Sequence, residues 1–219
     1  MSRVRYAIVS CAGLGSRLGL NSAKCLVHVE GKRIIDYLLP LVADIEDLRV
    51  VVGFQEAEVM EHVSKIRPDA VFVRNPSYAS TSNSYSVNLA THDLHEPFMI
   101  IDGDMIIEPA SFRRFLLAAE CGESMVGVAR SKTDEAVFVK LDESGYVQQF
   151  HRSPRAPFEW CGVAYLAGIR IERSSKFVFD DLSRYLPLKS HELECVEIDT
   201  PDDLKMAQRE VHKYNFSYA

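Results

Sequence analysis

The sequence predicts an α/β fold: a three-layer sandwich in which helices cover both faces of a mostly parallel, mixed central sheet. Two observations point to this class. Continuous apolar runs alternate with stretches of helical periodicity over residues 5–130. The runs are rich in valine and isoleucine and lack the alternation of half-exposed strands, which is typical of parallel strands buried on both faces. A chain of 219 residues, 47% of them hydrophobic, suits one such domain over residues 1–219.

The first half of the chain alternates strand and helix. Apolar runs bounded by turn residues predict strands at residues 5–12, 48–54, 70–76, 98–107 and 124–130. Apolar residues at helical spacing predict helices at residues 34–45, 56–66, 82–94 and 111–120. Pro40 either kinks the first helix or starts a new turn within it. Thr81 or Ser82 suits the N-cap of the third helix, because either hydroxyl can accept a free backbone N–H.

The second half is richer in strands. Residues 136–152 predict two strands joined by the turn DESG, and residues 159–171 predict another β-rich run. A helix is expected at residues 176–186, and the chain closes with a strand, a turn and a helix that begins at TPDD. The less regular segment 131–160 is expected to lie over one edge or end of the sheet, as an inserted β-ribbon.

Composition and charge exclude several classes of protein. The formal net charge is −6, the pI is about 5.7 and basic residues form no block, so no nucleic-acid partner is expected. No run approaches the ~20 apolar residues of a membrane span, and the first apolar run is too short for a signal peptide. We therefore expect a cytoplasmic protein with no membrane partner. The cysteines lack Cys-x-x-Cys spacing and are expected to be reduced and mostly buried: Cys11, Cys25, Cys121, Cys161 and Cys195.

The first strand is followed by the glycine-rich stretch SCAGLGSRLG, residues 10–19. Such a turn points backbone N–H groups at an anion. It is no Walker A loop, because the required Gly-Lys-Ser/Thr is absent. It also fails the dinucleotide fingerprint, since Leu18 replaces the third glycine and the second strand ends without an acidic residue. Arg17 and Lys24 add positive charge, so the turn indicates a phosphate site of another kind.

The longer pattern AGLGSRLG-x4-KCLVHVEGKRIIDYLL resembles the signature of nucleotidyltransferases that join a nucleoside monophosphate to a phosphorylated small molecule. That signature is a Gly-x-Gly-x-Arg turn, a Pro-Lys pair, a hydrophobic strand and a Gly-Lys-Pro-Leu-like turn. This chain departs from it at Ser10, Ala23 and Arg33–Ile34, and no departure removes a charged group. IDGD (101–104) and EIDTPDDL (197–204) resemble the two blocks that carry the family's metal-binding aspartates. The resemblance implies a Rossmann-like, glycosyltransferase-A-like fold.

Two further stretches narrow the resemblance. NPSYASTSNSYSVNLA (75–90) and EWCGVAYL (159–166) are similar to segments of bacterial phosphocholine cytidylyltransferases and their relatives, which include enzymes acting on aminoethylphosphonate. The resemblance implies CTP as the nucleotide, a small phosphorylated or phosphonate acceptor, and release of pyrophosphate. A sugar-1-phosphate nucleotidyltransferase using UTP, dTTP or GTP is one alternative, and a non-catalytic nucleotide-binding regulatory domain is another. A homodimer fits the resemblance, although the sequence carries no interface signal.

The resemblance also implies roles for the charged residues. Arg17 is expected to grip the β- and γ-phosphates, and Lys24 to offset charge at the α-phosphate; these two are the expected catalytic residues. Asp104 and Asp199 each end an apolar strand and are the expected ligands of Mg²⁺, the implied cofactor. Asp102 is the rival of Asp104, and Asp199 can instead cap the last helix. The expected nucleotide-binding residues are Ala12, Gly13, Leu14, Gly15, Ser16, Ser82, Asn83 and Asp102.

Several of these residues have a structural alternative. Gly13 and Gly15 are expected where the backbone approaches the phosphates too closely for a Cβ. Ser82 and Asn83 can read a pyrimidine edge, or simply cap the helix. Aromatic and acidic residues are expected to hold a cationic acceptor, although such aromatics are more often core residues. The expected acceptor-binding residues are Tyr85, Arg152, Glu159 and Trp160, with Tyr78 beside them and His151 or Lys140 as alternatives to Arg152.

Overall fold

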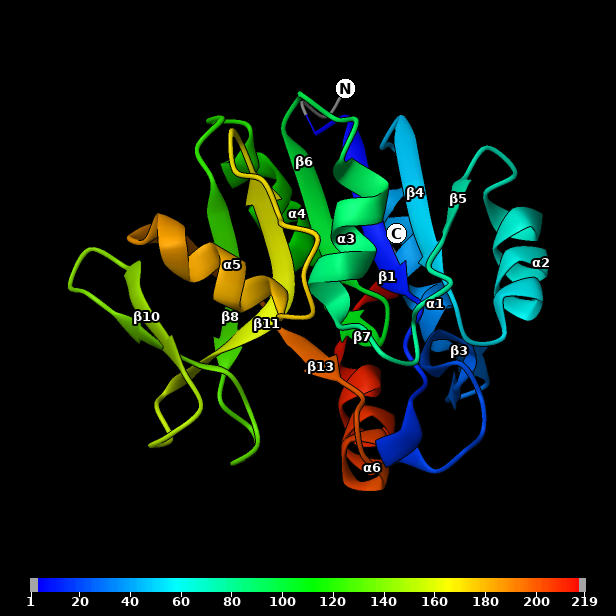
Figure 1. Cartoon of the computed structure of the whole chain (residues 1–219). Coiled ribbons are helices and arrows are strands. Elements are labelled where there is room, and N and C mark those ends of the chain that lie inside the picture. The colour runs from blue at the N-terminus through cyan, green and yellow to red at the C-terminus, as the bar shows by residue number, and fades with distance from the viewer. Residues whose placement is uncertain (1–3, 217–219) are drawn as a thin grey trace.

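A nine-stranded sheet forms the centre of the molecule (Figure 1). The computed structural model describes residues 4–216. Strands β11 (Phe158–Leu166) and β10 (Tyr146–His151) run against their neighbours, and the other strands share one direction, so the sheet is mixed and mostly parallel, as predicted. Its order is β5 (Val71–Arg74), β4 (Asp47–Val52), β1 (Tyr6–Cys11), β6 (Phe98–Asp102), β11 (Phe158–Leu166), β8 (Met125–Arg130), β12 (Leu188–Glu192), β10 (Tyr146–His151) and β9 (Phe138–Leu141).

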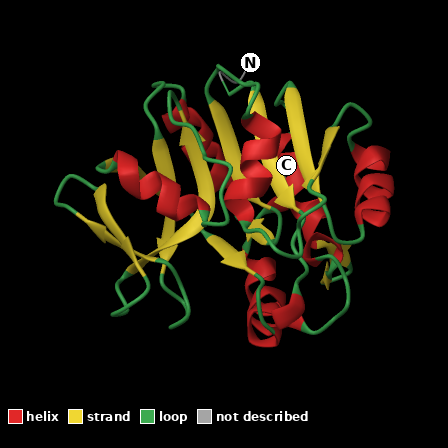
Figure 2. Ribbon diagram, in the orientation of Figure 1, coloured by secondary structure: helices red, strands yellow, loops and turns green. Residues whose placement is uncertain are grey.

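Helices cover both faces of this sheet, which gives the expected three layers (Figure 2). The alternation of side chains along β1 divides the core. Ala7 and Val9 pack in one cluster with residues of three of the helices whose bounds follow, α1, α2 and α4, whereas Ile8 packs in another with residues of α3 and α5. The helices are α1 (Ile34–Leu38), α2 (Glu56–Ile66), α3 (Asn83–Thr91), α4 (Pro109–Ala119), α5 (Val178–Leu182) and α6 (Pro201–Glu210).

The expected strand at 98–107 is in fact two strands in two sheets. β6 ends at Asp102, and β7 (Met105–Ile107) pairs with β13 (Cys195–Glu197) in a separate two-stranded sheet. The break occurs at Gly103, whose N–H donates to the carbonyl of Ser10 over 3.0 Å. A Cβ on Gly103 would lie 2.5 Å from Cys11 Sγ, so glycine lets the chain turn away against β1. A third core cluster joins this small sheet to α6 and α1.

Two expected helices are shorter than predicted. α1 ends at Leu38, and Pro40 lies at the start of a new 3₁₀ turn, Leu39–Val42, which is one of the two outcomes expected for this proline. α5 ends at Leu182 and continues as the 3₁₀ turn Ser183–Tyr185. A short hairpin, β2 (His28–Val29) and β3 (Lys32–Arg33), precedes α1.

The ribbon expected within segment 131–160 is present at one edge of the sheet. β9 and β10 pair antiparallel and are joined by the DESG turn, as predicted. Asp142 Oδ1 accepts the N–H groups of Ser144 and Tyr146, and Gly145 has a φ of +81°. All five cysteines are free, and all but Cys121 are buried. Within residues 4–216, no helix has the length and apolar character needed to cross a membrane.

Candidate active site

A cavity of about 710 Å³ opens where β1 and β6 end. The carboxyl ends of parallel strands are the usual ligand-binding edge of an α/β sheet, because the loops that follow the strands converge there. The residues predicted for the site line this cavity, except Tyr85 and the two alternatives to Arg152, His151 and Lys140. The lining therefore brings together the loop after β1, the start of α3, the β6–β7 turn and the segment after β13.

The glycine-rich loop carries Lys24 into the cavity. Gly15 has a φ of +62°, and a Cβ there would lie 2.8 Å from Lys24 Cγ, so this glycine is required by its backbone and by the lysine stem. Gly13 differs, because a Cβ on it would meet no atom of residues 4–216 within 4 Å. Among described protein atoms, only Gly15 of these two glycines has a close neighbour, and the expected approach of both glycines to phosphates stays a prediction. Gly13 faces open space within the cavity lining.

Two cations and two carboxylates form a linked group. Lys24 Nζ donates to Asp104 Oδ2 over 2.9 Å and also to Asp199 Oδ1, and Arg17 Nη2 donates to Asp199 Oδ2 over 2.7 Å. The Lys24 side chain is only 16% exposed, whereas that of Arg17 is 58% exposed. Burial lowers the pKa of Lys24, but the carboxylates of Asp104 and Asp199 outweigh it and raise the pKa well above its usual value. Lys24 therefore stays charged at neutral pH.

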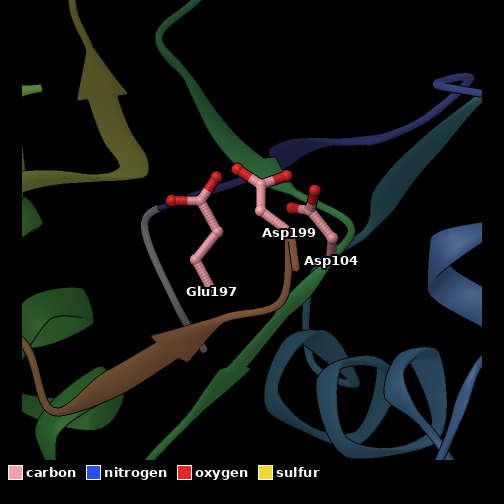
Figure 3. A group of neighbouring side chains, drawn as sticks. All are labelled: Asp104, Glu197 and Asp199. Atoms are coloured by element: carbon pink, nitrogen blue, oxygen red, sulfur yellow. The ribbon is translucent and has the colours of Figure 1, made fainter. Parts of the chain in front are cut away.

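Asp104, Glu197 and Asp199 form an acidic cluster (Figure 3). One carboxylate oxygen from each lies within 4.8 Å of the others, and Figure 3 shows the three groups converging. The β7–β13 pairing builds the cluster, because Glu197 pairs with Met105 and the N–H of Ile198 donates to the carbonyl of Asp104 over 3.0 Å. Asp104 Oδ1 is buried and has no hydrogen-bond partner among residues 4–216.

This donor set fits a small divalent cation. Three carboxylates supply the hard oxygen ligands that Mg²⁺ prefers, and the unpartnered oxygen of Asp104 is costly to bury without one. Asp199 does not cap the last helix, because Thr200 occupies the N-cap of α6 and its hydroxyl accepts the N–H of Asp203. Sequence reasoning missed Glu197. The signal was present, since Glu197 lies only two residues before Asp199, and Figure 3 shows their carboxylates turned toward the same place.

Asp102 lines the cavity but does not belong to the acidic cluster. Its side chain fits against Gly162, where a Cβ would lie 2.6 Å from Asp102 Oδ2. Gly162 has a φ of +71°, so glycine at this position satisfies both the backbone and the carboxylate. Burial at the cavity floor, followed by repulsion from Asp104, raises the pKa of Asp102 to about 7.

The first turn of α3 faces the cavity with Ser82 and Asn83. Asn83 Oδ1 accepts the N–H of Val178 over 3.1 Å, and the Ser82 hydroxyl donates to the carbonyl of Lys176 instead of capping the helix. Tyr85 does not line the cavity with them. Tyr85 follows Asn83 by two residues, about 200° around the helix, and its hydroxyl accepts from Arg173 Nη2 over 2.7 Å outside the cavity lining.

Arg152, Glu159 and Trp160 line the other part of the cavity. Trp160 is only 8% exposed and meets Phe150 edge-on, with ring centroids 6.0 Å apart, so it is mainly a core residue. The Arg152 guanidinium lies 5.3 Å from the ring centroids of both Phe177 and Phe179 and occupies those ring faces.

Glu159 and Lys132 lie beside each other in this part of the cavity. Burial raises the pKa of Glu159, and its Oε2 accepts the N–H of Lys132 over 3.4 Å. Lys132, which the sequence reasoning did not select, lines the cavity and donates its Nζ to the carbonyl of Cys195 over 2.5 Å. No motif marks Lys132, because it lies in the irregular segment between β8 and β9. The cavity lining thus includes the cations Arg17, Lys24, Lys132 and Arg152.

Sequence comparison identifies the family of this chain. Residues 7–159 match the model of the MobA-like NTP transferase domain. The CMP-5'-(3-aminopropyl)phosphonate synthase of Streptomyces rubellomurinus is 30% identical over 183 residues, which cover 77% of this chain and 28% of that protein. The chain therefore spans little more than a quarter of the length of this curated relative.

Solved structures share the fold. The CTP:phosphocholine cytidylyltransferase of Streptococcus pneumoniae superposes with a TM-score of 0.79 at 22% identity, covering 94% of this chain and 98% of that one. A putative glucose-1-phosphate thymidylyltransferase of Bacillus anthracis has a TM-score of 0.81 at 17% identity, covering 97% of each chain. The architecture is the Rossmann-like α/β fold of nucleotidyltransferases. With more than half of its length matched by the family model, the chain belongs to the MobA-like NTP transferase domain family.

Proposed function

We propose that this protein is a Mg²⁺-dependent cytidylyltransferase that transfers CMP from CTP to the phosphate or phosphonate of a small amino-bearing molecule. One observation carries the proposal: Arg17, Lys24 and the cluster of Asp104, Glu197 and Asp199 meet in one cavity beside the glycine-rich loop. Two cations suit a triphosphate, and three carboxylates suit the metal that accompanies it. The choice of CTP is supported by the 30% identical relative, whose name describes a CMP-phosphonate product.

In the proposed reaction, an oxygen of the acceptor attacks the α-phosphorus of CTP. A new phosphorus–oxygen bond forms, the bond to the bridging oxygen of the β-phosphate breaks, and pyrophosphate leaves. The attacking phosphate or phosphonate is already anionic near neutral pH, so no strong general base is required. Catalysis then rests on positioning and charge. Lys24 offsets the negative charge that gathers at the α-phosphate, and Arg17 holds the β- and γ-phosphates with its planar fork.

Substrate binding must rearrange the ion pairs of the free protein. Lys24 and Arg17 now contact carboxylates, and a triphosphate offers them stronger partners. Asp104, Glu197 and Asp199 would hold Mg²⁺, which when bound supplies charge neutralisation to the phosphates. Each charged group would then keep a partner of opposite charge, because Lys24 and Arg17 would bind the triphosphate while the carboxylates would bind the metal. Ser82 and Asn83 are proposed to contact the base, since both line the cavity at the start of α3.

The acceptor is proposed to carry a primary ammonium group. The Arg152 guanidinium lies over the rings of Phe177 and Phe179, so a cation already lies against two of the aromatic residues that line the cavity. Glu159 is instead a half-buried carboxylate with one weak backbone partner, and it can pair with a primary ammonium. Lys132 and Arg152 are the cations available for the acceptor phosphate or phosphonate. Glu159 therefore favours an acceptor with a primary amine, such as an aminoalkylphosphonate or phosphoethanolamine.

The test is pyrophosphate release in the presence of Mg²⁺, with CTP, UTP, ATP, GTP and dTTP each paired with a panel of acceptors. The panel contains 2-aminoethylphosphonate, phosphoethanolamine, phosphocholine, inositol phosphate and glucose-1-phosphate. Release with CTP and an amino-bearing acceptor is the expected result, and the Lys24→Met protein is the matched blank. Release only with a sugar phosphate and another nucleotide would make the protein a sugar-1-phosphate nucleotidyltransferase. Nucleotide binding without release from any pair would favour a regulatory nucleotide-binding domain.

A further inference from the structure

Gln55 has a left-handed backbone conformation, which is unfavourable for a residue other than glycine, and its side chain binds the glycine-rich loop instead of capping α2. It is one of three non-glycine residues among residues 4–216 with positive φ, at +50°, and it occupies the N-cap of α2. Its side chain does not cap that helix. Instead, Gln55 Oε1 accepts the N–H of Ala23 over 2.8 Å, and Nε2 donates to the carbonyl of Asn21 over 3.3 Å. One amide group thus holds the backbone immediately before Lys24 at two points.

Ala23 has the backbone conformation of a proline. Its φ is −55° and its ψ is 128°, which lie in the range that a pyrrolidine ring enforces. The residue is completely buried and is the N-cap of the 3₁₀ turn that begins with Lys24. The Ala23 dihedral angles therefore set the direction in which Lys24 leaves the loop. An alanine does not lock φ by itself, so an outside restraint is needed to keep this geometry.

The turn that carries Gln55 is itself fixed against the glycine-rich loop. The N–H of Phe54 donates to the carbonyl of Ala12 over 3.1 Å, at the opposite end of the loop from Ala23. Gly53 lies so close that a Cβ there would be 2.8 Å from the Ala12 carbonyl oxygen. The β4–α2 turn therefore contacts the loop before its glycines and again just before Lys24. Gln55 makes the second of these contacts.

We propose that Gln55 is a positioning residue that holds Lys24 in its catalytic direction by clamping the backbone of Asn21 and Ala23. Hydrogen bonding from Gln55 supplies the restraint that a proline at position 23 would supply covalently. A proline at position 23 would have no N–H to donate to Gln55. The proline ring and the Gln55 hydrogen bond are therefore alternative restraints that cannot act together at this position. This inference rests on the proposed function, because the clamp matters for turnover only if Lys24 acts on the α-phosphate.

The first test compares Gln55→Gly, Ala23→Pro and the double variant. Glycine accepts a positive φ without strain, so Gln55→Gly removes the clamp and leaves the α2 turn intact. Its kcat is expected to fall about 10- to 100-fold, as misplacement of a catalytic group by about 1 Å does, while KM for the nucleotide changes less. In Ala23→Pro the ring Cδ replaces the donated proton and crowds Gln55 Oε1, so this variant loses activity too. The double variant has room for the ring and is expected to recover most of the lost kcat.

A matched control separates the clamp from general effects of glycine. Glu30→Gly makes the same change at another positive-φ residue, whose φ is +47°, in the exposed turn between β2 and β3. It is expected to leave kcat unchanged. Hydrogen exchange of the Ala23 amide supplies a readout that needs no substrate: exchange is expected to accelerate in Gln55→Gly and not in Glu30→Gly. If no substrate pair is turned over, the proposed function fails, and the exchange rates still decide whether the clamp exists.

Three results would overturn the inference. One is a Gln55→Gly protein with kcat within about twofold of the unmodified chain. Another is a fall in kcat with no change in exchange at Ala23, which would show that Gln55 acts by some other route. The third is a folded double variant that is no more active than Gln55→Gly. That result would show that restraining φ at position 23 does not help to position Lys24.

Discussion

Replacing Lys24 by methionine is the sharpest test of the site, because it removes one charge and nearly preserves the side-chain volume. Lys24 lies between Asp104 and Asp199, and all three side chains are less than a fifth exposed. Exposed ion pairs contribute about 0.2–1 kcal/mol, whereas breaking a buried pair costs about 3–5 kcal/mol. The pairs of Lys24 lie between these two limits, so we expect Lys24→Met to lose about 2 kcal/mol in the free energy of unfolding. At about 2–4 °C per kcal/mol for a chain of this size, Tm should fall by about 4–8 °C.

The expected effect on turnover is larger than the effect on folding. Removing one preorganised group from a developing negative charge typically costs about 10²–10³ in kcat. Mg²⁺ should recover part of the lost Tm, since it can neutralise Asp104 and Asp199, but it should not recover kcat. The pH dependence follows from the raised pKa of Lys24. Its stabilisation is fully present below the unfolded value of 10.5 and is lost as the pH rises through the higher folded pKa, so the Tm difference should persist at neutral and mildly alkaline pH.

The assay pairs thermal unfolding with pyrophosphate release, each with and without Mg²⁺. Lys65→Met is the matched control, because Lys65 makes the same type of pair with Glu61 on an exposed helix face, and its Tm and kcat should not change. A Lys24→Met protein that retains more than about a tenth of the kcat would refute the catalytic assignment. An unchanged Tm would refute the inference that the two carboxylates depend on Lys24 in the free protein.

Three further predictions concern the same cavity. Gly15→Ala should lose both stability and kcat, because its Cβ meets the stem of Lys24. Gly19 also has a positive φ, but a Cβ there would meet no described atom within 4 Å, so Gly19→Ala should lose only about 1 kcal/mol of stability. Denaturant unfolding and turnover, measured for both variants, compare the two. Glu197→Gln should raise the Mg²⁺ concentration needed for half-maximal activity about 10-fold or more, and a metal titration that superposes on that of the unmodified enzyme would remove Glu197 from the metal site. Glu159→Gln should raise KM for an amino-bearing acceptor and also raise Tm at pH 7. The folded pKa of Glu159 is raised by burial, so its ionised form costs stability above that pKa, and the Tm advantage should vanish below about pH 4.5, where folded and unfolded states are both protonated.

The sequence predicts the parts of the molecule that depend on local pattern. Buried strands such as β1 and β4 are continuous apolar runs, and their ends are marked by glycine or acidic residues. Asp104 follows the end of a buried strand, where ligands of α/β sheets bind, and the resemblance of the glycine-rich loop to the nucleotidyltransferase signature added Lys24, so both could be placed in one site without coordinates. The DESG turn was readable for the same reason, because a short run of turn residues specifies its own geometry.

What the sequence could not predict depends on contacts between distant segments. After Asp102 the chain leaves the nine-stranded sheet and enters the small β7–β13 sheet. This turn follows from the close approach of Gly103 to Cys11, which no local pattern encodes. The position of Tyr85 outside the cavity lining depends on the phase of α3, since a shift of two residues along a helix reverses the face. The clamp by Gln55 was invisible, since nothing in a single sequence pairs a residue after β4 with the backbone of the preceding loop.

The Lys24–Asp199 pair has a consequence for the protein as it is being made. The two residues are 175 positions apart, whereas Lys24 and Asp104 are only 80 apart. At about 5–20 residues per second, a ribosome needs about 10–35 s to travel from Lys24 to Asp199. During that interval the nascent chain contains the glycine-rich loop and Lys24, but Glu197 and Asp199 have not yet been made. The acidic cluster of Asp104, Glu197 and Asp199 can therefore be completed only late in synthesis.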